Sequence, residues 1–240
     1  MATAPVPAPA PAVLTYGERE KYDALLNALD DTSAQANCGS MAWTKPLSNR
    51  FIYADGHAHF TGFLHLHDWK WRGSSKKGVH ILLSIKERIR CSDKSLVASG
   101  IHSDYYFVEN NTAKLLHSVH FDFDGTKDCH PLFHAQLCSD RIALDGFIAS
   151  EIEFEYQIDP APATCFRDAR IPTCDMTLPS VLLCLAADHF EKPFFCQFRE
   201  EATVLQQALP HPAITSLRQS IAGAPNHLRS SHWFSHTVNG

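Results

Sequence analysis

The amino-acid sequence predicts one α+β domain, in which helices pack on one face of a mainly antiparallel β-sheet. Three observations predict it. An amphipathic stretch stands near the start of the chain, and a long region follows in which apolar and polar residues alternate. From residue 178 the apolar residues recur with the period of a helix. The chain has 240 residues, which is enough to bury one large core.

The first helix is expected at residues 16–29, where apolar residues recur at positions 22, 25, 26 and 29. Residues 1–14 form a Pro/Ala-rich tail, which we expect to be disordered. This tail lacks the basic start and the long apolar run of a signal peptide. Residues 30–49 are mostly polar and are expected to form a loop. The domain itself should occupy residues 15–240.

The sheet is expected at about residues 50–158, because side chains alternate between apolar and polar there. The alternating segments are residues 57–67, 79–90, 115–124, 130–138 and, most regularly, 148–158. One dry and one solvated face are typical of antiparallel sheets. The residues expected to be buried on the dry face are Ile81, Leu83, Val119, Phe121, Phe133, Ile152 and Phe154.

The helical part is expected at about residues 178–222. The stretches LPSVLLCLAADHF and FFCQFREEATVLQQAL have helical periodicity, and Pro193 separates them. Pro179 stands near the start of the first helix, where a missing amide proton costs least. A shorter helix is expected at residues 213–221.

The composition narrows the class of protein. The formal net charge is −5, so the chain as a whole is not a basic nucleic-acid binder. None of the eight cysteines forms a Cys-x-x-Cys pair, which disfavours zinc-knuckle and dithiol redox sites. No apolar run approaches the ~18 residues of a membrane span. We therefore expect a reduced, cytoplasmic protein without a membrane partner.

Two His-x-His pairs stand close together: His57 with His59, and His65 with His67. The stretch Asp-Gly-His-Ala-His-Phe resembles the first-strand signature of the amidohydrolase barrels, in which two histidines hold a metal. That fold needs eight β/α units, whereas the hundred residues that follow here read as strands. The cupin pattern is excluded as well, because no glutamate follows the second pair within a few residues. The sequence favours a solvated strand face over a metal site, and it assigns no metal or other cofactor.

Further polar residues should point to the same face if the strands are neighbours. They are His80, His120, Asp122, Asp124, His130 and His134. Histidine beside carboxylate can bind a divalent metal or move protons in phosphodiester cleavage. The candidate catalytic residues of such a nuclease are His120, Asp122, His130 and His134. The alternative interpretation is that these residues mark solvated strand ends beside turns.

Residues 69–94 form a basic hairpin with eight cationic and two anionic side chains, and tryptophans at positions 69 and 71. Cations interleaved with aromatic residues can follow a phosphate backbone while stacking on bases. The candidate nucleic-acid-binding residues are Lys70, Arg72, Lys76, Lys77, Lys86, Arg88 and Arg90. The alternative is a charged hairpin that resists pairing with other strand edges.

Two family resemblances involve the second half of the chain. The segment HPLFHAQL, followed by RIPTCDM and the apolar helix, resembles a group of uncharacterised bacterial proteins with His-Pro-x-x-His-x-Gln and Arg-Ile-Pro motifs. The likeness covers about residues 79–190, and it implies a setting among mobile-element and phage-defence genes. The order of helix, strand meander, His-Pro, Cys138 and helices is similar to the ubiquitin-conjugating E2 layout, which implies a thiolate nucleophile at Cys138. The alternative for Cys138 is a small residue of a strand.

Three functional hypotheses follow. The first is an accessory or binding component of a bacterial anti-phage defence or toxin-type system, which binds nucleic acid or a protein partner in a larger complex. The second is a nuclease that uses the His/Asp face. The third is an E2-like transferase that acts through Cys138. The sequence does not decide whether the protein is an enzyme.

Overall fold

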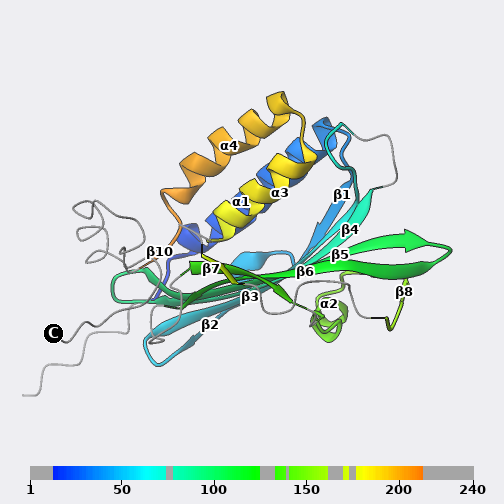
Figure 1. The fold of residues 1–240 in the computed structure, drawn as a ribbon. Coiled ribbons are helices and arrows are strands. Elements are labelled where there is room, and N and C mark those ends of the chain that lie inside the picture. Colours follow the sequence, from blue (N-terminus) through cyan, green and yellow to red (C-terminus); the bar gives the residue numbers. More distant parts are fainter. Residues whose placement is uncertain are drawn as a thin grey trace, which may run out of the picture.

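The computed structural model describes residues 13–73, 78–124, 133–138, 141–161, 170–172 and 177–212 (Figure 1). Its helices are α1 (Tyr16–Gln35), the 3-10 turn η1 (Leu47–Asn49), α2 (Asp145–Ala149), α3 (Leu178–His189) and α4 (Lys192–Gln206). Its strands are β1 (Ser40–Trp43), β2 (Phe51–Ala54), β3 (His57–Trp69), β4 (Val79–Arg90), β5 (Ser95–Glu109), β6 (Thr112–Asp124), β7 (Phe133–Cys138), β8 (Gln157–Ile158), β9 (Arg170–Pro172) and β10 (His211–Pro212).

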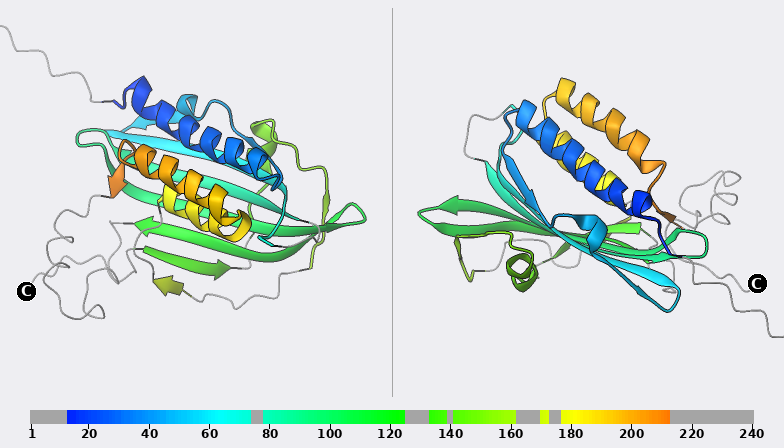
Figure 2. Two further views of the ribbon diagram at one scale, coloured as in Figure 1. Left: turned by 90° about the horizontal axis from the view of Figure 1, so that it is seen from above. Right: turned by 180° about the vertical axis from the view of Figure 1, so that it is seen from behind.

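The described strands form one sheet, in the order β1-β3-β4-β5-β6-β7-β9. Strands β3 to β7 are consecutive antiparallel neighbours, which is the expected meander. Strand β2 pairs with the start of β3, and the two-residue strands β8 and β10 pair in parallel with β6 and β5. Helices α1, α3 and α4 lie together on one face of the sheet, whereas α2 lies on the other (Figures 1 and 2). The predicted α+β fold is confirmed.

Helix α1 begins at a capping box. The Thr15 hydroxyl accepts a hydrogen bond from the Glu18 amide at 3.3 Å, and the Glu18 carboxylate accepts one from the Thr15 amide at 2.8 Å. The helix continues to Gln35, six residues beyond the expected end. The loop expected at residues 30–49 is therefore wrong in part, because it also contains β1 and η1.

The main core lies between the helices and the dry face of the sheet. Leu25, Leu26 and Leu29 of α1 are fully buried in one cluster with residues of β3, β4 and β5. Ile81 and Leu83 of β4 are also fully buried, as predicted. Burying a Leu or Ile side chain contributes about 1.5–3 kcal/mol, so this contact accounts for the position of the helices.

The other expected core residues differ in burial. Ile152 is buried, whereas Val119, Phe121 and Phe154 are half-buried. Val119 and Phe121 belong to β6, which lies toward the side of the sheet away from α1 (Figure 2). The helical layer therefore covers them less completely than it covers β4. The side chain of Phe133 lies outside the described residues, as do residues 1–12 of the tail and the helix expected at 213–221.

The strand predicted at 148–158 is wrong. This segment contains the end of α2, an irregular stretch and the short strand β8. Its apolar residues Ile152, Phe154 and Tyr156 do not pair into the sheet but pack across its polar face, in a second core cluster. That cluster combines Ile152, Phe154, Tyr156 and Ile158 with Leu82, Tyr106 and Phe147, among others. Ile158 pairs with Ala113 of β6, and Ile148 is exposed. Alternation of apolar and polar residues therefore also occurs in a segment that packs across a sheet instead of adding a strand to it.

None of the described helices has the length and apolar content needed to cross a lipid bilayer.

A carboxyl group is buried beneath α1. Glu87 of β4 points into the helix-covered face, where the Tyr22 hydroxyl donates to its carboxylate at 2.6 Å. Glu87 is only 6% exposed. Burial raises the pKa of Glu87 to about 7, because a carboxylate loses hydration there.

We expect Glu87→Gln to remove a pH-dependent part of the free energy of unfolding. The pKa of Glu87 is about 7 in the folded protein, against 4.5 for an exposed carboxyl. The folded state therefore binds this proton more tightly, so its stabilising contribution is complete below about pH 4.5 and is lost as the pH rises through about 7. From pH 5 to 8, the wild type should lose up to roughly 3 kcal/mol relative to the variant.

Urea unfolding at several pH values measures this difference. Glu200→Gln is the matched control, since Glu200 is exposed on α4 and should follow the wild type. Identical pH profiles for the wild type and Glu87→Gln would contradict the assignment.

Candidate metal centre

Three histidines meet at one end of β3 and β4. His65 and His67 are two residues apart on β3 and point to the same face, and His80 stands near the start of β4. The backbone pairs Leu66 with Ile81 and Trp69 with Val79. Two residues of β3 therefore stand opposite His80 alone, which is a β-bulge.

Asp68 and Gly78 shape this bulge. Asp68 has a φ of +53°, a left-handed conformation that Asp tolerates better than most residues. The Gly78 amide donates to the Asp68 carboxylate at 3.0 Å. A Cβ atom on Gly78 would lie 2.4 Å from the Asp68 backbone, so only glycine fits there without displacing the bulge.

The nitrogen atoms of the three imidazoles are close enough to share one ion. One ring nitrogen from each of His65, His67 and His80 lies within 4.8 Å of the other two. The Nε2 atom of His65 is 3.2 Å from the Nδ1 atom of His80, and the rings of His67 and His80 are 4.4 Å apart. Among the described residues, this is the one group of three or more His, Cys, Asp or Glu side chains with that geometry.

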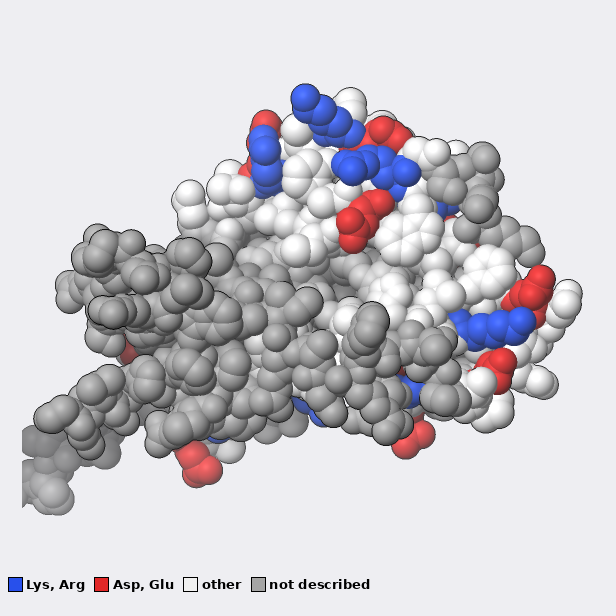
Figure 3. All heavy atoms as spheres, viewed as in Figure 1, with Lys and Arg blue, Asp and Glu red and all other residues white. Residues whose placement is uncertain are grey.

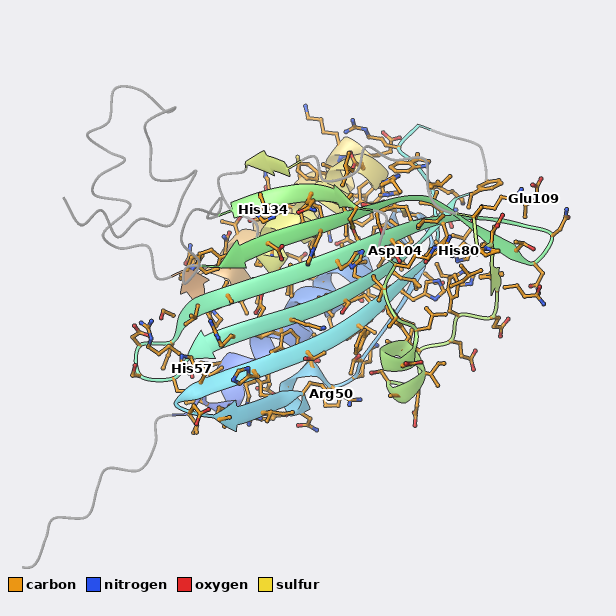
Figure 4. The ribbon with its side chains drawn as sticks, turned by 60° about the horizontal axis from the view of Figure 1, so that its bottom comes forward. Arg50, His57, His80, Asp104, Glu109 and His134 are labelled. Atoms are coloured by element: carbon orange, nitrogen blue, oxygen red, sulfur yellow. The ribbon has the colours of Figure 1, made fainter. Side chains whose placement is uncertain are left out.

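The irregular segment after α2 covers this cluster (Figure 4). The Phe154 ring lies 5.3 Å from that of His65, and the Tyr156 ring lies 4.8 Å from that of His80. His65 and His80 are consequently 3% and 5% exposed, whereas His67 is at the surface. The Tyr156 hydroxyl is 3.4 Å from Nε2 of His67. The cluster thus has two buried members and one that meets solvent.

Burial keeps the two inner imidazoles neutral. It lowers the pKa of His65 to about 4, and it lowers that of His80 to about 4, with His67 as a further cause. The Nδ1 atom of His65 is 2.9 Å from the carbonyl oxygen of Glu153, which can only accept. We therefore assign the His65 proton to Nδ1, which leaves a lone pair on Nε2 toward His80. A neutral imidazole oriented by a backbone carbonyl is the form that binds metals.

This donor set suits a transition metal. Imidazole nitrogens bind zinc, copper, iron and nickel, whereas calcium and magnesium require oxygen ligands. Three protein ligands leave one position of a tetrahedral site for water or substrate. The chemistry of the residues therefore fits a zinc-class ion.

Three of the four expected catalytic residues come together elsewhere on the same face. One Asp122 oxygen is 3.1 Å from Nε2 of His120, and the other is 3.6 Å from Nε2 of His134. The strand register produces this contact, because β6 pairs Asp122 with His134 of β7. The fourth residue, His130, lies outside the described residues, and so does the side chain of Asp124.

The candidate nucleic-acid-binding residues separate into two places. Lys70 and Arg72 follow β3, where their amides donate to the carbonyl oxygens of Cys38 and Asp188 near the end of α3. Lys86, Arg88 and Arg90 lie toward the other end of β4, on the polar face.

Lys76 and Lys77 lie outside the described residues. On the side of the molecule in Figure 3, cationic side chains over the helices stand beside anionic ones. Because its described cations lie at opposite ends of β3 and β4, the described part of the hairpin does not present one continuous basic surface.

Cys138 ends strand β7 and is 9% exposed. Its sulfur is 3.6 Å from Nε2 of His102, which is also 3.1 Å from a carboxylate oxygen of the buried Asp104. Burial acts to raise the pKa of Asp104, but hydrogen bonds from His102, Ser118 and the Ile142 amide hold it below its usual value. The cysteine is thus a strand residue packed beside a polar cluster, and not a loop residue.

Comparisons with protein-family models, with curated proteins and with solved structures find no match to this chain. The resemblances noted from the sequence, and the setting that they imply, stay predictions.

The expectation of a solvated histidine face is correct for His59 and His67 but wrong for His65 and His80. His57 is half-exposed, at the opposite end of β3 from His67. Sequence reasoning placed His80 on the correct face but did not pair it with His65 and His67. The sequence did contain one signal, the glycine-containing turn expected between β3 and β4. A turn of this kind brings the end of one strand, with His65 and His67, beside the start of the next, with His80.

We expect Gly78→Ala to destabilise the protein and to disturb the cluster, because the added methyl group collides with the Asp68 backbone. Overpacking of this kind costs roughly 1–3 kcal/mol. Gly17→Ala is the control, since nothing lies within 4 Å of a Cβ atom there and alanine favours a helix. Chemical unfolding measures both. Equal stability of Gly78→Ala and the wild type would show that the bulge is not held as described.

Proposed function

We propose that this protein binds one divalent transition-metal ion of the zinc class through His65, His67 and His80. The observation that carries the proposal is the convergence of three imidazole nitrogens within 4.8 Å. Two of these side chains are buried, and burial lowers their pKa values to about 4, so protons do not compete for them at neutral pH.

The arrangement resembles catalytic metal sites more than structural ones. Structural zinc sites are closed by four protein ligands, whereas catalytic sites use three. A metal held by three histidines lowers the pKa of its bound water and supplies a nucleophile at neutral pH. The residues of the chain then have separate tasks: His65 and His80 anchor the site from within, and exposed His67 completes it at the surface. The Tyr156 hydroxyl, 3.4 Å from His67, is placed to orient that ring.

Zinc titration by calorimetry tests the proposal. The wild type should bind one equivalent, and zinc at 100 times the dissociation constant should stabilise the fold by about 2.7 kcal/mol. His67→Ala should weaken the affinity at least about 100-fold, because a direct ligand contributes more than the outer partners whose loss costs 10–100-fold. His67 is exposed, so this variant should keep its fold.

The chain offers a matched control in its other His-x-His pair. The double variant His57→Ala, His59→Ala removes two histidines from the same strand, and zinc affinity should not change. An affinity equally reduced in both variants, or no zinc binding by the wild type, would exclude the centre.

The second candidate function is phosphodiester hydrolysis at His120, Asp122 and His134. The observation that favours it is the Asp122 carboxylate, which contacts a different histidine with each oxygen. A carboxylate that orients an imidazole is one arrangement for general acid–base catalysis. This candidate and the metal centre occupy different parts of the face.

If this second site is active, Asp122→Asn should lower the hydrolysis rate of bis(p-nitrophenyl) phosphate by about 10²–10⁴-fold. The substitution keeps the size of the side chain but removes its charge. His67→Ala should leave this rate unchanged if the two sites are independent. A rate unaffected by Asp122→Asn would remove the second candidate.

A further inference from the structure

The described residues leave one half of the polar face uncovered. The segment after α2 covers the end that carries the histidine cluster, and the opposite end bears a shallow depression of about 400 Å³. Its lining includes His59, Lys86, Arg88, Ala98, Gly100 and Asp122. The depression does not include the metal centre, and it borders the second candidate site through Asp122 alone among the residues of that site.

The strand register explains its shape. Lys86 of β4 stands opposite Gly100 of β5, and Arg88 stands opposite Ala98. A glycine and an alanine thus form the middle of the depression, beside two long cationic side chains. The nearest atom to a Cβ on Gly100 would be an Asp122 oxygen at 3.3 Å. The floor is therefore nearly bare backbone.

The two cations in the depression form no ion pair with a described residue, although the Asp122 carboxylate also lines it. No carboxylate of the described residues lies within 4.0 Å of Lys86 or Arg88, whereas Arg90 pairs with Asp93. The acidic residue between them, Glu87, points to the other face and binds Tyr22. The Nε atom of Arg88 is buried and has no hydrogen-bond partner among the described residues. A buried donor without an acceptor costs about 1–3 kcal/mol.

We infer that this depression binds a phosphate group, which Lys86 and Arg88 hold. A guanidinium presents its donors as a planar fork that matches phosphate oxygens, and the Lys86 ammonium adds a point charge. His59 stands opposite Arg88 on β3 and can donate from a ring nitrogen. Bound phosphate would supply the acceptor that the Arg88 Nε atom lacks.

The ligand can be longer than one phosphate. Arg90 and His57 continue the same face beyond Arg88 and His59, at two-residue steps of roughly 7 Å along each strand. Such a ladder of donors fits successive phosphates of one nucleic-acid strand, but a free nucleotide offers the same chemistry at the depression. The experiment separates the two sources.

The test uses the full-length protein and two probes: a fluorescent single-stranded oligodeoxynucleotide, followed by anisotropy, and ATP, followed by calorimetry. The double variant Lys86→Glu, Arg88→Glu should weaken binding at least tenfold. The control variant Lys114→Glu, Arg199→Glu makes the same charge change at exposed positions on β6 and α4 and should stay within about twofold of the wild type. If folding of the double variant fails, Lys86→Glu alone replaces it, since Lys86 is exposed.

Binding of the oligonucleotide alone assigns the site to a strand, and its affinity should then fall steeply with salt. Binding of ATP as well assigns it to a phosphate group as such. The inference is overturned if the wild type binds neither probe at low salt, or if the control variant loses as much affinity as the site variant. Zinc binding by His65, His67 and His80 is unaffected by either result.

Discussion

Side-chain alternation along β3 to β6 is the constraint on which the rest of the structure depends. Helices α1, α3 and α4 bury one face of these strands, so every second residue must point to the opposite face. That opposite face receives the histidines, the cations and Asp122. A shift of the register by one residue would move all of these groups into the apolar core. The strand register therefore determines both which residues form the core and which form the candidate sites.

The segment after α2 then divides the polar face into two environments. At one end it buries His65 and His80 beside Phe154 and Tyr156, and at the other end it leaves Lys86 in solvent. The polar face thus carries neutral imidazoles at its covered end and a solvated ammonium group at the other. Burial at the covered end is what lowers the pKa values of His65 and His80 and keeps their rings neutral.

The sequence predicted the sheet and the helical layer because both have strong periodicity over many residues. It placed His80, His120, Asp122 and His134 on one face for the same reason. The covering segment was predicted as a strand, since alternation in Ile152, Phe154 and Tyr156 is the same whether a segment pairs with neighbours or packs across them.

The candidate metal centre was not assigned from the sequence for a related reason. The bulge at His67 and Asp68 depends on one left-handed residue and one glycine, and neither changes the periodic pattern. The burial of His65 and His80 depends on residues more than 70 positions away. The periodicity of neighbouring residues does not indicate contacts between segments that are distant in the sequence.

Protonation of the histidine cluster is also linked to the stability of the fold. His65 and His80 have folded pKa values of about 4, below the ordinary value of 6.5, so their neutral forms stabilise the fold above about pH 6.5. That contribution is lost as the pH falls through about 4, when both rings must charge inside an apolar cover. A cation on these nitrogens uses the same lone pairs that protons would take. Because burial keeps both rings neutral at neutral pH, their lone pairs remain available to a metal ion. The segment that covers the cluster therefore destabilises the fold in acid and favours metal binding at neutral pH.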